Sequence, residues 1–269
     1  MSSRIHGSRN ILVFVSVLCF VSTTFALTRI TNLTPNIRNL RSLRLSMGLI
    51  VEKDEMSVGV ALCKILETEY QRSILRKGSF AFSISGGSML KMLSNLRDVS
   101  NNGIDWSKCT MGFVSHRCVG LEDDAATFHK AKPLFLDAWM SDGLKVLTVT
   151  GSTDAEKEAI SYEESLRALP ADILPWNSDG YPVFDLLLIG VGTDGHVGSI
   201  YPNLPDTESC RVVVPVTQPA SKPVKISLSL KSMLASRASV VACAGKSSKV
   251  CRRLFCSFFI CSRCDMFCA

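Results

Sequence analysis

The stretch that decides the fold is Phe184-Asp-Leu-Leu-Leu-Ile-Gly-Val-Gly-Thr-Asp-Gly-His196. Its first half is a nearly continuous apolar run, which is typical of a strand buried on both faces of a parallel sheet. Its second half places three glycines, Asp194 and His196 directly after that strand. A carboxylate two residues before an imidazole on a tight turn suits a general base with an orienting acid. The alternative is that Asp194 caps a following helix and His196 lies in its first turn.

Strand-like and helix-like segments alternate on both sides of this stretch. Apolar runs cover residues 80–85, 110–115, 145–149 and 239–243, and helical patterns cover residues 56–75, 88–96, 125–135 and 155–169. This alternation predicts an α/β fold, with a single doubly wound, mostly parallel sheet and helices on both faces, in the Rossmann-like manner. No internal repeat or low-complexity linker interrupts residues 51–250, so we expect one domain there. Functional residues of such folds lie on loops at the carboxyl ends of strands.

A second unusual loop, Ser85-Gly86-Gly87-Ser88, follows the apolar run over residues 80–85. Paired glycines let backbone N–H groups approach an anion closely, which is the chemistry of a phosphate site. The loop is neither a P-loop nor a dinucleotide-binding loop, because the Lys-Ser/Thr of the first and the spacing of the second are missing. An ordinary Gly-Gly-Ser turn is the alternative.

The charge of the chain is uneven. The chain has 30 basic and 24 acidic residues, a net charge of +6, yet its first 50 residues hold six Arg and no Lys, Asp or Glu. The remaining 219 residues therefore carry 24 charges of each sign. A balanced body lacks the positive face that nucleic acid requires, so we expect no nucleic-acid partner.

The N-terminal 50 residues have the composition of a two-part targeting sequence. An apolar run over residues 11–21 follows two arginines and precedes small residues, which predicts a signal peptide over residues 1–26. Residues 27–50 carry four Arg and no acid, which predicts a transit-peptide-like segment and a plastid location, without stable membrane insertion after processing. The alternatives are that the run is a buried strand or helix, or that the protein resides in the secretory pathway or the ER lumen.

The last 19 residues differ from the rest. Residues 251–269 hold five of the eleven cysteines and show neither helical nor strand periodicity. Half of a zinc knuckle, Cys261-x-x-Cys264, has no second pair at suitable spacing, so we expect no metal site. We expect an atypical Cys-rich tail after a domain, over residues 51–250, that is C-terminally incomplete.

Three segments resemble the 6-phosphogluconolactonase family, within the superfamily that includes glucosamine-6-phosphate deaminase. Residues 184–202 resemble its strand, Gly-x-Gly-x-Asp-Gly-His and the small residue, Ser, two apolar residues and Pro that follow. Residues 83–88 resemble its phosphate loop. Residues 221–230 resemble its Lys-Pro segment, with Lys225 where Arg is usual. The likeness runs in order over about residues 55–250.

The resemblance implies hydrolysis of 6-phosphoglucono-δ-lactone to 6-phosphogluconate in the oxidative pentose phosphate pathway, without a metal or an organic cofactor. His196 would take a proton from the attacking water, and Asp194 would hold the imidazole. The partner would be a small sugar-phosphate lactone, and the oligomeric state is left open. The phosphate-binding residues that it implies are Gly86, Gly87, Ser88, Arg117, Lys222 and Lys225.

One stretch departs from the family pattern. Ser115-His116-Arg117 stands where the family usually has Asp-Glu-Arg. Either the protein is a diverged enzyme in which His116 fills the space, or it is a non-catalytic sugar-phosphate-binding protein that keeps Arg117 and the Gly-Gly-Ser loop. An amino-sugar-phosphate deaminase is disfavoured, because Val197–Pro202 lacks the Glu that assists ring opening in that group.

Overall fold

The structure is a computed structural model that describes residues 11–17, 46–52, 54–94, 103–216 and 222–243. Its strands are β1 (Ile11–Val17), β2 (Ser46–Glu52), β3 (Phe80–Ile84), β4 (Cys109–Phe113), β5 (Ser115–Arg117), β6 (Lys145–Val146), β7 (Leu186–Gly190), β8 (Val213–Val216), β9 (Lys225–Leu228) and β10 (Ala238–Cys243). Its α-helices are α1 (Glu55–Lys77), α2 (Ser88–Ser94), α3 (Thr127–Ala131), α4 (Asp137–Ser141), α5 (Ala155–Arg167) and α6 (Leu230–Leu234). A π-helical turn, η3 (Lys132–Leu136), joins α3 to α4, and two 3-10 turns, η2 (Trp106–Lys108) and η4 (Pro205–Glu208), complete the elements.

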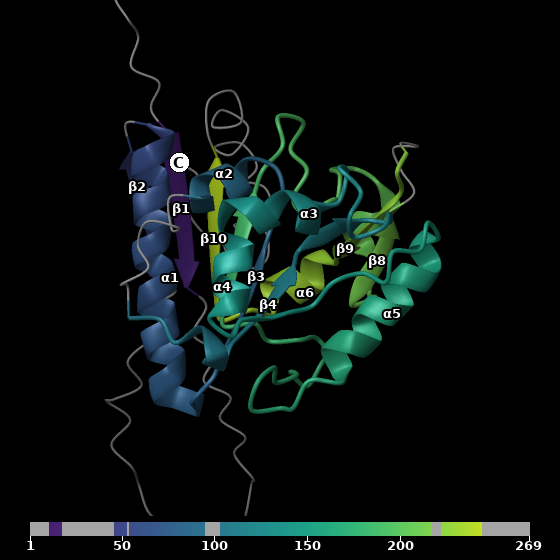
Figure 1. Ribbon diagram of the computed structural model, residues 1–269. Helices are drawn as coiled ribbons and strands as arrows, with labels where there is room; N and C mark the ends of the chain where they lie inside the picture. The colour runs from purple at the N-terminus through teal and green to yellow at the C-terminus, as the bar shows by residue number, and fades with distance from the viewer. Residues whose placement is uncertain (1–10, 18–45, 53, 95–102, 217–221, 244–269) are drawn as a thin grey trace, which may run out of the picture.

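The main sheet has seven strands in the order β2-β1-β10-β7-β3-β4-β6 (Figure 1). From β10 to β6 neighbouring strands run parallel, whereas β1 and β2 pair antiparallel beyond β10. The predicted mostly parallel α/β sheet is confirmed. A second, antiparallel sheet in the order β5-β9-β8 was not predicted. Its strands have three or four residues each, too few to show a clear alternation of apolar and polar residues.

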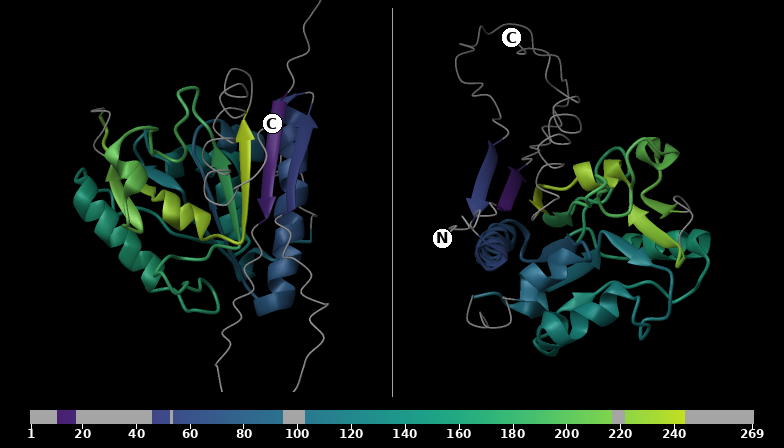
Figure 2. Two further views of the ribbon diagram at one scale, coloured as in Figure 1. Left: turned by 180° about the vertical axis from the view of Figure 1, so that it is seen from behind. Right: turned by 90° about the horizontal axis from the view of Figure 1, so that it is seen from above.

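Both faces of the main sheet are covered. On one face Phe80, Phe82 and Ile84 of β3 pack in a core with residues of α1, α2 and α4, including Trp139 of α4. On the other face Ala81 packs in a core with residues of α5, β8, β9 and α6. Figures 1 and 2 show α1 along the side of the molecule formed by β1 and β2, and α5 beside β8 and β9 at the opposite side. The alternation of β3 side chains between two apolar layers explains why its sequence is a continuous apolar run.

Asp185, the acid inside the stretch quoted first, is a structural residue. It is buried, accepts a hydrogen bond of 2.8 Å from the Ala81 backbone N–H, and pairs with Arg76 at 2.6 Å and Lys77 at 3.0 Å. These contacts tie the end of α1 to the starts of β3 and β7. Arg237 Nε lies 3.8 Å from the same carboxylate, so three cations compensate the charge of this buried acid.

Part of the N-terminal apolar run forms β1. Val13 pairs with Ala242 of β10 on one side and with Ile50 of β2 on the other. This placement makes part of the run a strand, which was one of the alternatives for it. Residues 1–10 and 18–45 lie outside the described residues, as does the tail over residues 251–269, so the signal peptide, the transit segment and the character of the tail stay predictions. No helix in the described part of the chain is long and apolar enough to cross a membrane.

Candidate active site

The glycine-rich loop after β7 holds a carboxylate against an imidazole. The Asp194 Oδ1 atom lies 2.6 Å from His196 Nδ1 and also accepts a bond of 3.3 Å from the His196 backbone N–H. The turn is closed by a 2.9 Å bond from the Gly192 N–H to the His196 carbonyl. A Cβ atom at Gly192 would lie 2.3 Å from the His196 ring, so a glycine is required there. The described residues 191–200 form turns and bridges and not a helix, so the helix-cap alternative for Asp194 is wrong.

The protonation of this pair follows from its geometry. Partial burial raises the pKa of Asp194, but the backbone N–H, the ring and the charge of His196 outweigh it and hold that pKa below its usual value. An ionised Asp194 accepts from Nδ1–H, which leaves Nε2 of a neutral ring free to take a proton. The His196 side chain is 33% exposed, so the ring is accessible to small molecules. The pair can therefore act as a general base.

The Ser85–Ser88 loop lies beside the Asp194–His196 turn because β3 and β7 are parallel neighbours. The Ser85 N–H donates to the Leu188 carbonyl at 2.8 Å, which fixes the start of the loop on β7. Gly87 has a φ of 68°, a conformation that favours glycine. Within the described part of the chain, the N–H groups of Gly86 and Gly87 donate to no other group. They are available to a bound anion.

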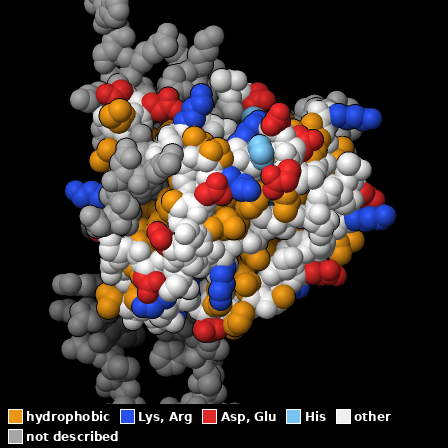
Figure 3. Space-filling model, in the orientation of Figure 1, with side chains coloured by type: hydrophobic (Ala, Val, Ile, Leu, Met, Phe, Trp, Pro, Cys, Tyr) orange, Lys and Arg blue, Asp and Glu red, His pale blue; other side chains and the backbone are white. Residues whose placement is uncertain are grey.

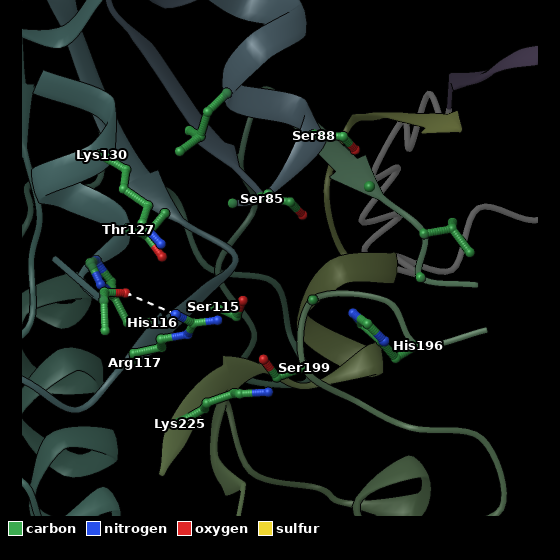
Figure 4. Close-up of a pocket in the computed structure, with 18 residues that line it drawn as sticks. Ser85, Ser88, Ser115, His116, Arg117, Thr127, Lys130, His196, Ser199 and Lys225 are labelled. Atoms are coloured by element: carbon green, nitrogen blue, oxygen red, sulfur yellow. Dashed lines mark hydrogen bonds between the residues drawn. The ribbon is translucent and has the colours of Figure 1, made fainter. Parts of the chain in front are cut away.

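Arg117 and Lys225 are two basic residues that lie side by side on the small sheet. They are register partners on β5 and β9. Arg117 Nη1 donates to the Ala125 carbonyl at 3.3 Å, and Lys225 Nζ lies 3.4 Å from the Tyr201 hydroxyl. Figure 4 shows both side chains at the cavity, with the bond from Arg117 dashed. Lys222, the other basic residue predicted to bind phosphate, is exposed and does not line the cavity.

His116 lies in the same strand as Arg117 but in a different environment. Its side chain is buried, with its ring 4.5 Å from the Phe113 ring and 6.0 Å from the Tyr162 ring, measured between centroids. Neither ring nitrogen has a hydrogen-bond partner among the described residues. Burial lowers the pKa of His116 to about 3, so the ring is neutral at physiological pH. This buried, neutral ring corresponds to the alternative in which His116 fills the space that acids occupy in the family.

The Ser85–Ser88 loop, His116, Arg117, His196 and Lys225 line one cavity of about 360 Å³. Asp194 and Lys222 do not line it. Three polar residues that the sequence did not single out also line it: Thr127 and Lys130 on α3, and Ser199 after the Asp194–His196 turn. The helical pattern over residues 125–135 placed Thr127 and Lys130 on one helix, but nothing in it indicated which face would meet the cavity. Ser199 lies inside the stretch that resembles the family and could have been found there.

The fold and the site thus define an α/β protein in which an imidazole held by a carboxylate, a glycine-rich loop and basic side chains meet at one cavity. The family described as "Glucosamine-6-phosphate isomerases/6-phosphogluconolactonase" matches residues 53–257, and the chain belongs to this family.

Similar proteins agree with that assignment. The chain is 31% identical over 204 residues to "Probable 6-phosphogluconolactonase" of Schizosaccharomyces pombe, covering 73% of this chain and 77% of that one. It is 28% identical over 209 residues to "Probable 6-phosphogluconolactonase 4, chloroplastic" of Oryza sativa subsp. indica, covering 75% of this chain and 64% of the rice protein. The crystal structure of 6-phosphogluconolactonase from Leishmania guyanensis matches the fold with a TM-score of 0.58 at 19% identity, over 68% of this chain and 76% of that chain.

Proposed function

We propose that this protein is a 6-phosphogluconolactonase, which hydrolyses 6-phosphoglucono-δ-lactone to 6-phosphogluconate in the oxidative pentose phosphate pathway. The observation that carries the proposal is the 2.6 Å contact between Asp194 and His196, on a cavity that Arg117 and Lys225 also line. An enzyme that hydrolyses a phosphorylated lactone needs a base to activate water and positively charged groups to bind the phosphate. The relatives with 6-phosphogluconolactonase names support the same substrate.

In the proposed reaction, His196 Nε2 takes a proton from water as the water oxygen attacks the lactone carbonyl carbon. The tetrahedral intermediate then collapses, the bond from that carbon to the ring oxygen breaks, and His196 returns the proton to the ring oxygen. Asp194 keeps Nδ1 protonated and stabilises the ring while it is charged. General-base assistance of this kind is typically worth about 10²–10⁴-fold in rate.

The phosphate of the substrate is held by the Gly86, Gly87 and Ser88 loop together with Arg117 and Lys225. The loop offers two free backbone N–H groups and a hydroxyl, and the two side chains offer positive charge. Charge-assisted hydrogen bonds to phosphate are about twice as strong as neutral ones. The role predicted for Lys222 has no support from the placement of its side chain outside the cavity lining.

A second candidate is a non-catalytic sugar-phosphate-binding protein. It is favoured by one observation: Ser115 and the uncharged His116 occupy the strand where acids are usual in the family. The two candidates differ in whether the protein turns over its ligand.

The test is hydrolysis of freshly generated 6-phosphoglucono-δ-lactone by the full chain, measured as acid release above the spontaneous rate. We expect turnover that is proportional to protein concentration and saturates with substrate. Calorimetric titration with 6-phosphogluconate runs in parallel. Binding of that product without any rate above background would establish the binding protein and overturn the enzyme.

We also propose that residues 1–50 direct the protein to a plastid. The Arg-bearing, acid-free composition of residues 27–50 supports this, as does the chloroplastic name of the rice relative. Because β1 and most of β2 lie within residues 1–50, their removal would uncover the edge of β10. A fluorescent reporter carrying residues 1–50 should enter plastids, and one carrying residues 1–26 should stop in the secretory pathway. Diffuse cytosolic fluorescence from both reporters would contradict the proposal.

A further inference from the structure

The cavity contains a third basic residue to which neither the sequence nor the proposed function gives a role. Lys130 lies on α3 and lines the cavity together with Arg117 and Lys225. Of the described residues that line the cavity, none is an Asp or a Glu. Three cations without a carboxylate form a surface that attracts a ligand of high negative charge.

The position of Lys130 is set by the packing of α3 on the glycine loop. Thr127, three residues earlier on the same helix, is so close to Gly86 that a Cβ atom at Gly86 would lie 3.0 Å from the Thr127 methyl carbon. Residues three apart share one face of a helix, so the face that carries Thr127 also carries Lys130. In Figure 4 both side chains reach from α3 toward the side of the cavity where Arg117 lies, and His196 lies at the opposite side.

Lys130 differs from its charged neighbours on the same segment. Lys132 lies 3.7 Å from Glu122, and His129 lies 3.6 Å from both Glu122 and Asp124. Figure 3 shows acidic and basic side chains side by side on the surface over α3. The Lys130 ammonium group, by contrast, has no ion-pair or hydrogen-bond partner among the described residues. Its charge is free for a ligand in the cavity.

We propose that Lys130 binds the phosphate of the substrate together with Arg117 and makes the site selective for phosphorylated lactones over uncharged ones. This inference rests on the proposed function and adds to it an orientation for the substrate. The phosphate lies at the α3 and β5 side of the cavity, and the lactone carbonyl lies at the His196 side. Lys130 is a binding residue in this arrangement and takes no part in proton transfer.

The experiment compares Lys130→Met and Lys130→Arg with Lys132→Met as the matched control. The control removes the same charge two residues along the chain, where it is paired with Glu122. We expect Lys130→Met to raise KM for 6-phosphoglucono-δ-lactone about tenfold at unchanged kcat, the scale of one charge-assisted hydrogen bond. We expect Lys130→Arg to restore KM and Lys132→Met to leave it unchanged. Turnover of unphosphorylated glucono-δ-lactone should be the same in all variants.

Two results would overturn the proposal. The first is a KM in Lys130→Met that equals that of the wild type. The second is an equal loss for the phosphorylated and unphosphorylated lactones, which would show that Lys130 does not recognise the phosphate.

Calorimetry separates this inference from the proposed function. If the wild type binds 6-phosphogluconate without turning over the lactone, the proposed function fails. Lys130 is then judged by binding alone. Weaker binding of 6-phosphogluconate to Lys130→Met, with Lys132→Met unchanged, supports the inference, and equal binding to all three proteins overturns it.

Discussion

His196 and His116 follow the carboxyl ends of two strands in the same sheet, β7 and β4, yet only His196 is partly exposed and paired with a carboxylate. His196 is 33% exposed and holds Asp194 at 2.6 Å. His116 is 2% exposed, packs on Phe113 and Tyr162, and is kept neutral by burial. The comparison teaches that the neighbours of a histidine, and not its place after a strand, decide its role.

The difference arises from backbone geometry. His196 lies on a glycine-rich turn that brings its ring back onto the side chain of Asp194. His116 is the middle residue of β5, where side chains alternate between two faces. Ser115 and Arg117 are only partly buried and line the cavity. His116 between them also borders the cavity, but its ring is buried and packs against Phe113 and Tyr162.

The largest effect expected from this comparison is that of His196→Gln. The variant keeps a polar side chain but removes the atom that takes the proton, so kcat should fall about 10²–10⁴-fold. Binding of 6-phosphogluconate, measured by calorimetry, should change little because the phosphate contacts lie elsewhere. A variant with wild-type kcat would show that His196 is not the base.

A smaller loss is expected from Asp194→Asn. The amide cannot stabilise a charged imidazole and can hold the ring in the wrong tautomer, so kcat should fall about 10²-fold while KM stays within about twofold. A variant with wild-type kcat would remove Asp194 from the proposed role.

Arg117→Ala tests the neighbour of His116 that faces the cavity. Loss of a charge-assisted contact typically costs about 1.5–3 kcal/mol, so KM should rise at least tenfold. The fall in kcat should be much smaller, since Arg117 lies away from the reacting carbon. Normal affinity for 6-phosphogluconate in this variant would place the phosphate elsewhere.

The smallest effect on activity is expected from His116→Leu, which should leave kcat and KM within about twofold. Stability is the sensitive measure here. The pKa of His116 is about 3 in the folded protein and about 6.5 when unfolded, so the unfolded chain binds more protons between these values. Folding stability should therefore fall with decreasing pH in that window, by up to about 1.4 kcal/mol per pH unit from this one group.

His116→Leu removes that contribution, and it also removes two ring nitrogens that are buried without hydrogen bonds. Urea denaturation at pH 7 and pH 5 measures both effects. The variant should be at least as stable as the wild type at pH 7 and should lose less stability at pH 5. An identical loss in both proteins would show that His116 does not titrate as a buried group.

The sequence by itself determined the features that depend on local order. The apolar run before Gly190 predicted a central strand. The spacing of Asp194 and His196 predicted that their side chains pair, because both lie on one short glycine-rich turn. The sequence also predicted that both glycine-rich loops follow strands at the carboxyl edge of a parallel sheet. That those two strands, β3 and β7, are neighbours came from the structure. The family could be recognised from the same residues.

The tertiary structure alone decided the rest. It brought β5 and β9 together across more than 100 residues, so that Arg117 and Lys225 lie side by side at the cavity. It also buried the His116 ring and left Lys222 outside the cavity lining. It chose the face of α3 that brings Lys130 to Arg117, and it placed β1 beside β10 where the sequence predicted a signal peptide. Local patterns fix how a segment folds. Which segments meet depends on how apolar faces from distant parts of the chain pack together, and no short stretch of sequence carries that information.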